Sequence, residues 1–199
     1  MPRWITSDTA RAHCHRVRST MDAVVTGIGT VLADDPLLTV RLPGMAHARC
    51  VRVVCDRRLR LPLTSKLVRM AEMQPVWVLT TATAVEEAAS HATELREAGV
   101  VLHVVEDALL APLTILRILG ENGLSRVLIE AGAALSTAFL EARAVDMLYH
   151  YHAPMVLGNA GTHPIPRLEA ALAGRAPDFL TPLGPDLLYT YELASCLPD

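Results

Sequence analysis

The run from Ala23 to Arg41, AVVTGIGTVLADDPLLTVR, contains the residue pattern from which the rest of the fold is interpreted. Its opening residues are apolar and β-branched, which predicts a buried strand. The apolar run breaks at Gly27–Thr30, and the adjacent carboxylates of Asp34 and Asp35 follow before the terminal arginine. A buried strand that leads into glycines, a hydroxyl, two carboxylates and an arginine predicts the floor and rim of a ligand cleft.

Composition restricts the classes of protein to consider. The 199 residues are 51% hydrophobic and 20% charged, with a formal net charge of -3. These values disfavour both disorder and a surface that binds polyanions, so we expect no nucleic-acid partner. The four cysteines show no CxxC spacing and are expected to be reduced, which favours a cytoplasmic location. No apolar run is long enough to span a bilayer, and the N-terminus has no apolar signal region, so no membrane association is expected.

Hydrophobic periodicity predicts a single α/β domain over residues 1–199. Strands separated by helices of 10 to 15 residues indicate βαβ units, and therefore a mostly parallel sheet flanked by helices, with late strands possibly antiparallel. Besides the strand at 23–28, the expected strands are 51–56, 76–80, 100–105, 126–130, 145–152 and 186–193, and the expected helices are 8–20, 83–98, 112–119 and 133–142.

Two strand-to-helix turns contain small residues, and each has two interpretations. Gly27-Ile28-Gly29 fails as a Rossmann fingerprint, because Leu32 replaces the third glycine and no acid follows about 20 residues on. These glycines either form a tight strand exit or lie beside a ligand. The segment from Glu130 to Ser136 is either an ordinary connection or a phosphate site at a helix N-terminus.

Two clusters of polar residues invite functional interpretations. Arg57-Arg58 follows a strand, where it either recognises the 2′-phosphate of NADP or forms a solvated basic turn. His13-Cys14-His15 looks like a metal motif, but residues at i and i+2 of a helix point apart, so no shared metal ion is expected.

Several motifs resemble those of the reductase domain of the riboflavin-biosynthesis deaminase-reductase family. The matching residues are W-I-T at 4–6 with A-R at 10–11, D-A-V at 22–24, G-x-x-T-V-L-A-D-D-P-x-L-T-V-R at 27–41, and E-A-G at 130–132. The resemblance implies a dihydrofolate-reductase-like α/β fold with a mixed, mostly parallel sheet, usually as a homodimer. It also implies NADPH-dependent reduction of the ribose of 5-amino-6-(5-phosphoribosylamino)uracil to the ribityl chain.

The resemblance also implies roles for individual residues. Asp34 and Glu130 are the expected catalytic carboxylates, and the substrate is expected to contact Arg18, Leu38, Arg41 and Glu130. The residues expected to bind NADP are Trp4, Thr30, Asp34, Arg57, Gly132, Ala133, Ala134, Leu135 and Ser136. From the residues themselves, we expect Arg18 and Arg41 to converge on a phosphate while Glu130, at the end of its strand, meets polar groups of the ligand.

The chain departs from the family pattern in two places. Family members have a strand resembling K-x-A-x-S-x-D-G-[KR] before the tryptophan, whereas this sequence reads MPRW at residues 1–4, and it contains no H-A-E or P-C-x-x-C deaminase motif. The alternative expectations are therefore a truncated, catalytically poor nucleotide-binding module of the same family, or a related reductase acting on another pyrimidine or pterin-like compound.

Overall fold

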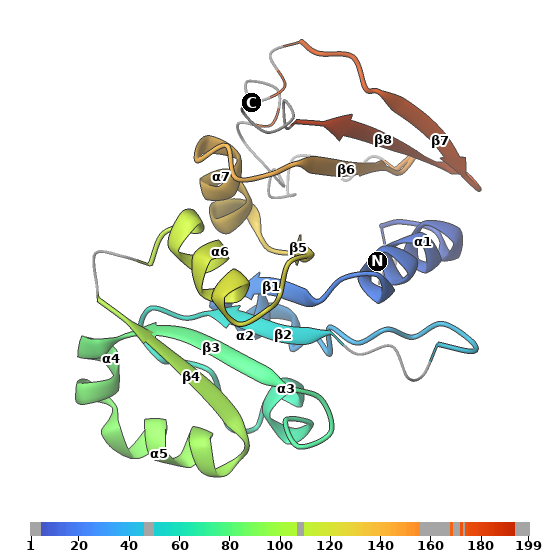
Figure 1. Cartoon of the computed structure of the whole chain (residues 1–199). Coiled ribbons are helices and arrows are strands. Elements are labelled where there is room, and N and C mark those ends of the chain that lie inside the picture. Colours follow the sequence, from blue (N-terminus) through green and yellow to red (C-terminus); the bar gives the residue numbers. More distant parts are fainter. Residues whose placement is uncertain are drawn as a thin grey trace.

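The computed structural model describes residues 5–45, 50–106, 110–155, 168, 172 and 174–193. Two sheets organise the chain: a five-stranded parallel sheet and a three-stranded antiparallel sheet (Figure 1). The elements are α1 (Asp8–Ser19), β1 (Ala23–Gly27), α2 (Ile28–Asp34), β2 (Val51–Cys55), α3 (Lys66–Arg69), β3 (Val76–Thr81), α4 (Ala82–Glu87), α5 (Ala89–Glu97), β4 (Val100–Val105), α6 (Pro112–Glu121), β5 (Val127–Ile129), α7 (Ala133–Glu141), β6 (Met147–His152), β7 (Phe179–Leu183) and β8 (Asp186–Glu192).

The parallel sheet has the strand order β4-β3-β2-β1-β5 and is covered on both faces. Its central strands are apolar on both sides, as expected for a parallel sheet between two helical layers. One layer, which contains α2, α3, α4 and α5, packs around Val24 and Val54. The other, which contains α6 and α7, packs around Val25 and Phe139. The expected α/β fold class is confirmed.

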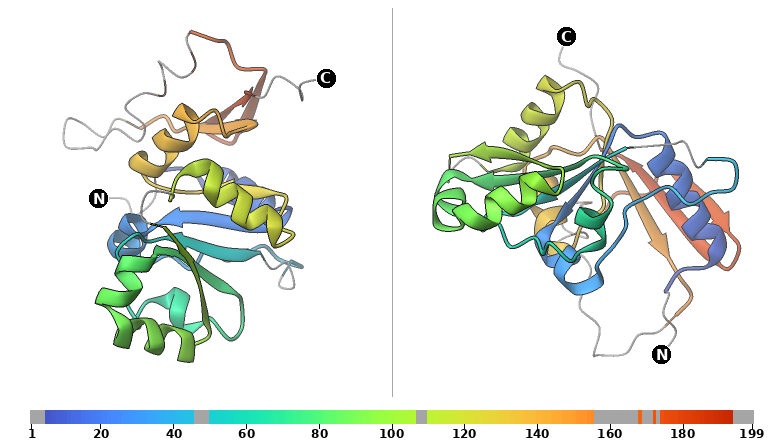
Figure 2. Two further views of the ribbon diagram at one scale, coloured as in Figure 1. Left: turned by 60° about the vertical axis from the view of Figure 1, so that its left-hand side comes forward. Right: turned by 90° about the horizontal axis from the view of Figure 1, so that it is seen from below.

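The late strands are antiparallel, as the sequence allowed, and pair in the order β6-β8-β7. Helix α1 lies against this second sheet, as the right-hand view of Figure 2 shows, and Ala10 packs there with Leu183 and Leu188. The backbone N–H of Ser7, the N-cap of α1, donates to the carboxylate of Asp186 at 2.7 Å. This contact fixes the start of α1 to the start of β8.

Three local predictions were wrong. The predicted helix 83–98 is divided into α4 and α5 at Ala88, whose φ of -120° and ψ of 43° are not helical. A two-turn helix, α2, occupies residues for which the sequence predicted no helix. It forms because Ile28 and Val31 share one buried face despite the helix-weakening Gly29. Strand β7 was missed because most of its side chains are exposed and Pro182 interrupts it.

Candidate functional site

A cavity of about 590 Å³ lies at the carboxyl ends of β1, β2 and β5. From β1 the sheet grows in one direction through β2, β3 and β4, whereas β5 pairs with the opposite edge of β1. The strand order therefore reverses between β1 and β5. Open parallel sheets bind ligands in the crevice at such a switch point. The cavity is lined by Gly27, Ile28, Gly29, Thr30, Ala33, Asp34, Cys55, Gly132, Ala133, Ala134, Leu135 and Ala138.

The two walls of the cavity are the helices that follow the two strands, α2 after β1 and α7 after β5. The backbone N–H of Gly132 donates to Oγ1 of Thr30 at 3.2 Å and so links the walls. No side chain caps α7, and Ala133 and Ala134 in its first turn line the cavity. An uncapped helix N-terminus attracts anions through its unpaired N–H groups and its dipole.

Most of the residues expected to bind a dinucleotide belong to these two walls. The cavity lining contains Thr30, Asp34, Gly132, Ala133, Ala134 and Leu135, and both glycines of the GIG turn lie beside the cavity. Two other expected residues, Ser136 and Arg57, are not part of the cavity lining, and a third, Trp4, lies outside the described residues. Ser136 donates its hydroxyl to the carbonyl of Ala131 at 3.1 Å, and Arg57 lies on an exposed turn two residues beyond Cys55.

The residues expected to bind substrate form a second group next to the cavity. Nη2 of Arg18, on α1, lies 2.6 Å from both carboxylate oxygens of Glu130, and its Nε lies 3.2 Å from Oε2. Nη1 of Arg18 donates to the carbonyl of Thr39 at 2.5 Å. Arg18 is only 5% exposed, whereas the Glu130 side chain retains 36% of its exposure. The arginine therefore ties α1 and the 39–41 segment to the end of β5.

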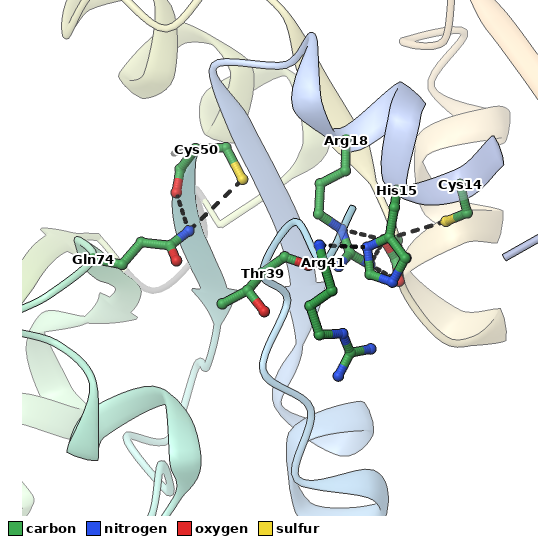
Figure 3. Close-up of polar contacts among 8 residues, drawn as sticks. Cys14, His15, Arg18, Thr39, Arg41, Cys50 and Gln74 are labelled. Atoms are coloured by element: carbon green, nitrogen blue, oxygen red, sulfur yellow. Dashed lines mark hydrogen bonds and ion pairs between the residues drawn. The ribbon is translucent and has the colours of Figure 1, made fainter. Parts of the chain in front are cut away.

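Leu38 and Arg41 reach this group through the backbone of the segment after α2. The side chain of Leu38 is 5% exposed and packs in the core with Val31 and Val54, so only its backbone is available to a ligand. The backbone N–H of Arg41 donates to Nδ1 of His15 at 3.4 Å (Figure 3). Three of the expected substrate residues, Arg18, Arg41 and Glu130, all act electrostatically on His15 and are thus brought together.

The electrostatics of this group disfavour a nucleophile. Cys14 lies 4.0 Å from Oε2 of Glu130, and burial together with that carboxylate raises the pKa of its thiol to about 11. Cys14 is therefore a neutral thiol at pH 7 and a poor attacking group. His13 points away to the hydroxyl of Tyr151 at 2.8 Å, so the two histidines of the HCH motif have separate partners, as their spacing predicted. In the described part of the chain no His, Cys, Asp or Glu residues gather as a possible metal site.

Sequence reasoning missed His15 and Thr39 as members of the site. A signal for His15 was present, because it lies three residues before Arg18 and therefore shares its face of α1. In the structure this face covers Glu130 and the 39–41 segment.

The fold and the cavity define an α/β protein with a cleft at the switch point of a parallel sheet. Comparison with known proteins narrows this class. The family model of the RibD C-terminal domain matches residues 1–176, so the chain belongs to the RibD C-terminal domain family. The resemblance of the sequence motifs is thereby confirmed.

Curated relatives and solved structures agree with this membership. The riboflavin biosynthesis protein RibD of Bacillus amyloliquefaciens is 34% identical over 157 residues, which are 79% of this chain and 41% of that protein. RibD of Mycobacterium tuberculosis is 31% identical over 192 residues, covering 94% of this chain and 47% of that protein. A structure of Acinetobacter baumannii RibD matches with a TM-score of 0.77 and 31% identity, over 96% of this chain and 52% of that one.

A fourth match is a solved structure whose description names a reaction. The Thermotoga maritima structure described as a diaminohydroxyphosphoribosylaminopyrimidine deaminase/5-amino-6-(5-phosphoribosylamino)uracil reductase matches with a TM-score of 0.71 and 26% identity, over 96% of this chain and 50% of that one. The chain thus spans about half the length, or less, of the curated relatives that it matches.

Proposed function

We propose that this chain reduces the ribose of 5-amino-6-(5-phosphoribosylamino)uracil to the ribityl chain, with NADPH as the reductant. The observation that carries the proposal is the cavity at the switch point, whose lining contains six of the residues that the family resemblance implies for NADP. Family membership supports the same reaction, since the Thermotoga maritima relative is described as a reductase of this substrate.

The cavity suits a dinucleotide in size and in chemistry. Its volume of about 590 Å³ falls within the range of roughly 300–1,000 Å³ usual for cofactor and ligand sites. A Cβ added to Gly29 would meet nothing within 4 Å, and one added to Gly132 would meet only Oγ1 of Thr30 at 3.5 Å. Glycines at these wall positions leave room for a close approach to the backbone, and the uncapped first turn of α7 is suited to a phosphate.

The substrate half of the site is the group formed by Arg18, Arg41 and Glu130. In this proposal Arg41 contributes positive charge for the phosphate of the sugar, and the Glu130 carboxylate accepts hydrogen bonds from substrate hydroxyls. Arg18 holds that carboxylate in a fixed orientation through three hydrogen bonds. Asp34 supplies a second carboxylate on the exposed part of the cavity wall.

Bound NADPH would supply a hydride to C1′ of the ring-opened Schiff-base form of the sugar, and the imine nitrogen takes up a proton. The contribution of the protein is then alignment and exclusion of water. The apolar wall formed by Ile28, Leu135 and Ala138 lines the cavity without offering a competing nucleophile. Covalent catalysis is not required, in agreement with the neutral thiol of Cys14.

The test combines cofactor titration with turnover. NADPH is titrated into the purified chain by calorimetry, and NADPH oxidation is followed by absorbance with the phosphoribosylaminouracil as substrate. Saturable NADPH binding with substrate-dependent oxidation is the expected result. Binding without turnover would favour the catalytically poor module, and absence of binding at millimolar NADPH would remove the proposal.

A substitution in the cavity wall locates the cofactor. Gly132→Val places a branched side chain at the cavity without a close backbone contact, so NADPH affinity should fall at least about tenfold while the domain stays folded. Gly120→Val on α6 is the control, because a Cβ there meets nothing within 4 Å and the residue lies outside the cavity lining. Equal NADPH affinity in the two variants would count against this site.

The proposal includes a homodimer in the cytoplasm. Phe179 and Leu180 on β7 are 58% and 55% exposed, and Met147 on β6 is 42% exposed. Phe179 and Met147 lie on one face of the sheet and Leu180 on the other, and large exposed apolar side chains are typical of interaction surfaces. Light scattering on the purified chain should give twice the monomer mass.

No helix in the described ranges is both long and apolar enough to cross a membrane.

A further inference from the structure

Residues 35–45, which follow α2, have an unusual backbone without helix or strand. Asp35 and Leu38 both have positive φ, 41° and 52°, although neither is a glycine. Such conformations cost of order 1–3 kcal/mol each and persist only where the surroundings hold them. The segment that carries Leu38 and Arg41 into the site therefore depends on anchors outside itself.

The anchors come from three directions. At the start of the segment, the Asp35 carboxylate accepts the backbone N–H of Lys66 at 2.8 Å. In the middle, the buried side chain of Leu38 packs into the core. At the end, two side chains of α1 hold the backbone: Arg18 donates to the Thr39 carbonyl at 2.5 Å, and His15 accepts from the N–H of Arg41 at 3.4 Å. Figure 3 shows these α1 side chains directed at the 39–41 segment.

We propose that His15 is a positioning residue for substrate, whose Nδ1 holds the backbone of Arg41 and so fixes the place from which the Arg41 side chain extends. The inference rests on the proposed function, because that function assigns Arg41 to the substrate phosphate. His15 acts through Arg41 and is not itself placed on the reacting atoms.

The hydrogen bond to Arg41 requires the neutral imidazole, with its proton on Nε2, since a protonated ring has no acceptor. Several groups face the ring. Burial, Arg18 and Arg41 lower the pKa of His15, whereas the Glu130 carboxylate and the Thr39 carbonyl oppose that shift, and the net shift is downward. The neutral form that accepts from Arg41 is thus favoured at pH 7, and acid removes the acceptor.

His13 provides a contrast on the same helix. Its Nδ1 contacts the Tyr151 hydroxyl at 2.8 Å, and its ring packs edge-on against Tyr149 and Tyr151 of β6. This histidine joins α1 to the three-stranded sheet. It is therefore a matched control for the loss of an imidazole from α1.

The experiment compares His15→Ala, His15→Gln and His13→Ala in the whole chain. Loss of one hydrogen bond should raise the KM for the pyrimidine substrate about 3- to 10-fold in His15→Ala, with the KM for NADPH changed less than about twofold. His15→Gln should restore most of the substrate affinity, because its amide oxygen can accept the same N–H. In the wild type the substrate KM should rise in acid, and this rise should be absent in His15→Gln.

Hydrogen exchange tests the same inference without turnover. Amides 39–42 should exchange faster in His15→Ala than in the wild type, and at near wild-type rates in His15→Gln and His13→Ala. If the wild type reduced no substrate, the proposed function would fail, and exchange would still decide whether His15 holds the segment. Unchanged exchange in His15→Ala overturns the inference. Faster exchange with an unchanged substrate KM in an active enzyme also overturns it, because the held segment would then not serve the substrate.

Discussion

Replacing Arg18 with methionine should destabilise the whole domain and not only its site. The substitution keeps a long apolar side chain but removes the guanidinium that bonds to Glu130 and to the carbonyl of Thr39. Three parts of the fold meet at this guanidinium: α1, the end of β5 and the segment after α2. The Arg18→Met variant therefore measures how strongly one buried side chain joins these parts.

The expected magnitude follows from burial and bond geometry. Removing one partner of a fully buried ion pair costs about 3–5 kcal/mol, because the other charge is left unpaired. Glu130 keeps 36% of its side-chain exposure and can be rehydrated in part, so we expect a smaller loss, about 2–3 kcal/mol. At 2–4 °C per kcal/mol for a chain of this size, the melting temperature should fall by about 4–12 °C.

The assay is urea unfolding at pH 7, with scanning fluorimetry at low and at high salt. An exposed ion pair of similar length serves as the control: Arg117 lies 2.7 Å from Glu121, with side chains 58% and 59% exposed. Arg117→Met should cost less than about 0.5 kcal/mol, and that small effect should vanish in salt. The loss in Arg18→Met should persist in salt, because the guanidinium is buried.

A double-mutant cycle isolates the ion pair. Arg18→Met combined with Glu130→Gln should cost less than the sum of the two single substitutions, by about 1–2 kcal/mol, because each single variant leaves one charged partner behind. The reasoning would be refuted if Arg18→Met melted within about 2 °C of the wild type, or if the two substitutions were additive.

Three further predictions concern other positions. Asp34→Ala should weaken NADPH binding in calorimetry but move the melting temperature by less than about 2 °C, because the side chain is an exposed part of the cavity wall; a large loss of stability would contradict its place there. Burial raises the pKa of Asp56, so the folded chain binds this proton more readily than the unfolded chain, and stability falls as pH rises from about 3.8 through the raised pKa. The unfolding free energy of Asp56→Asn minus that of the wild type should therefore grow with pH in urea titrations, and a flat difference would disprove the assignment. Arg143 has a φ of 52° directly after the C-cap of α7, where glycine is preferred, so Arg143→Gly should raise the unfolding free energy by about 0.5–1 kcal/mol; a lower melting temperature would be the contrary result.

Much of the parallel sheet was predictable from local pattern. Valine-rich runs such as Val51–Val54 and Val76–Val78 predict strands, and the predicted helices 83–98 and 112–119, which separate later strands, favour a parallel arrangement. Gly99 follows the C-cap of α5 at a φ of 85°, a position that favours glycine. The continuous helix over 83–98 was nevertheless wrong, because apolar spacing does not reveal a single non-helical residue such as Ala88.

The site was predictable to a different degree in its two halves. The cavity wall comes from turns that directly follow β1 and β5, so Thr30, Asp34 and Gly132 could be placed at a sheet edge from their position in sequence. The contact between His15 and Arg41 could not be predicted, because these residues lie 26 positions apart in the sequence and Arg41 lies outside the helices and strands. The bidentate contact between Arg18 and Glu130 could not be predicted either, because these residues are 112 positions apart.

The amino-acid sequence alone therefore determined the α/β class, the parallel core and the family to which the chain belongs, since each of these depends on local patterns of apolar residues, glycines and short motifs. The tertiary structure alone decided which face of α1 is covered. Periodicity placed Arg18 on the polar face of its helix, with a ligand phosphate as its expected partner, yet it is 5% exposed and bonded to Glu130. The physical reason is that a carboxylate and a carbonyl from distant segments satisfy its guanidinium, and hydrophobic periodicity carries no information about such partners.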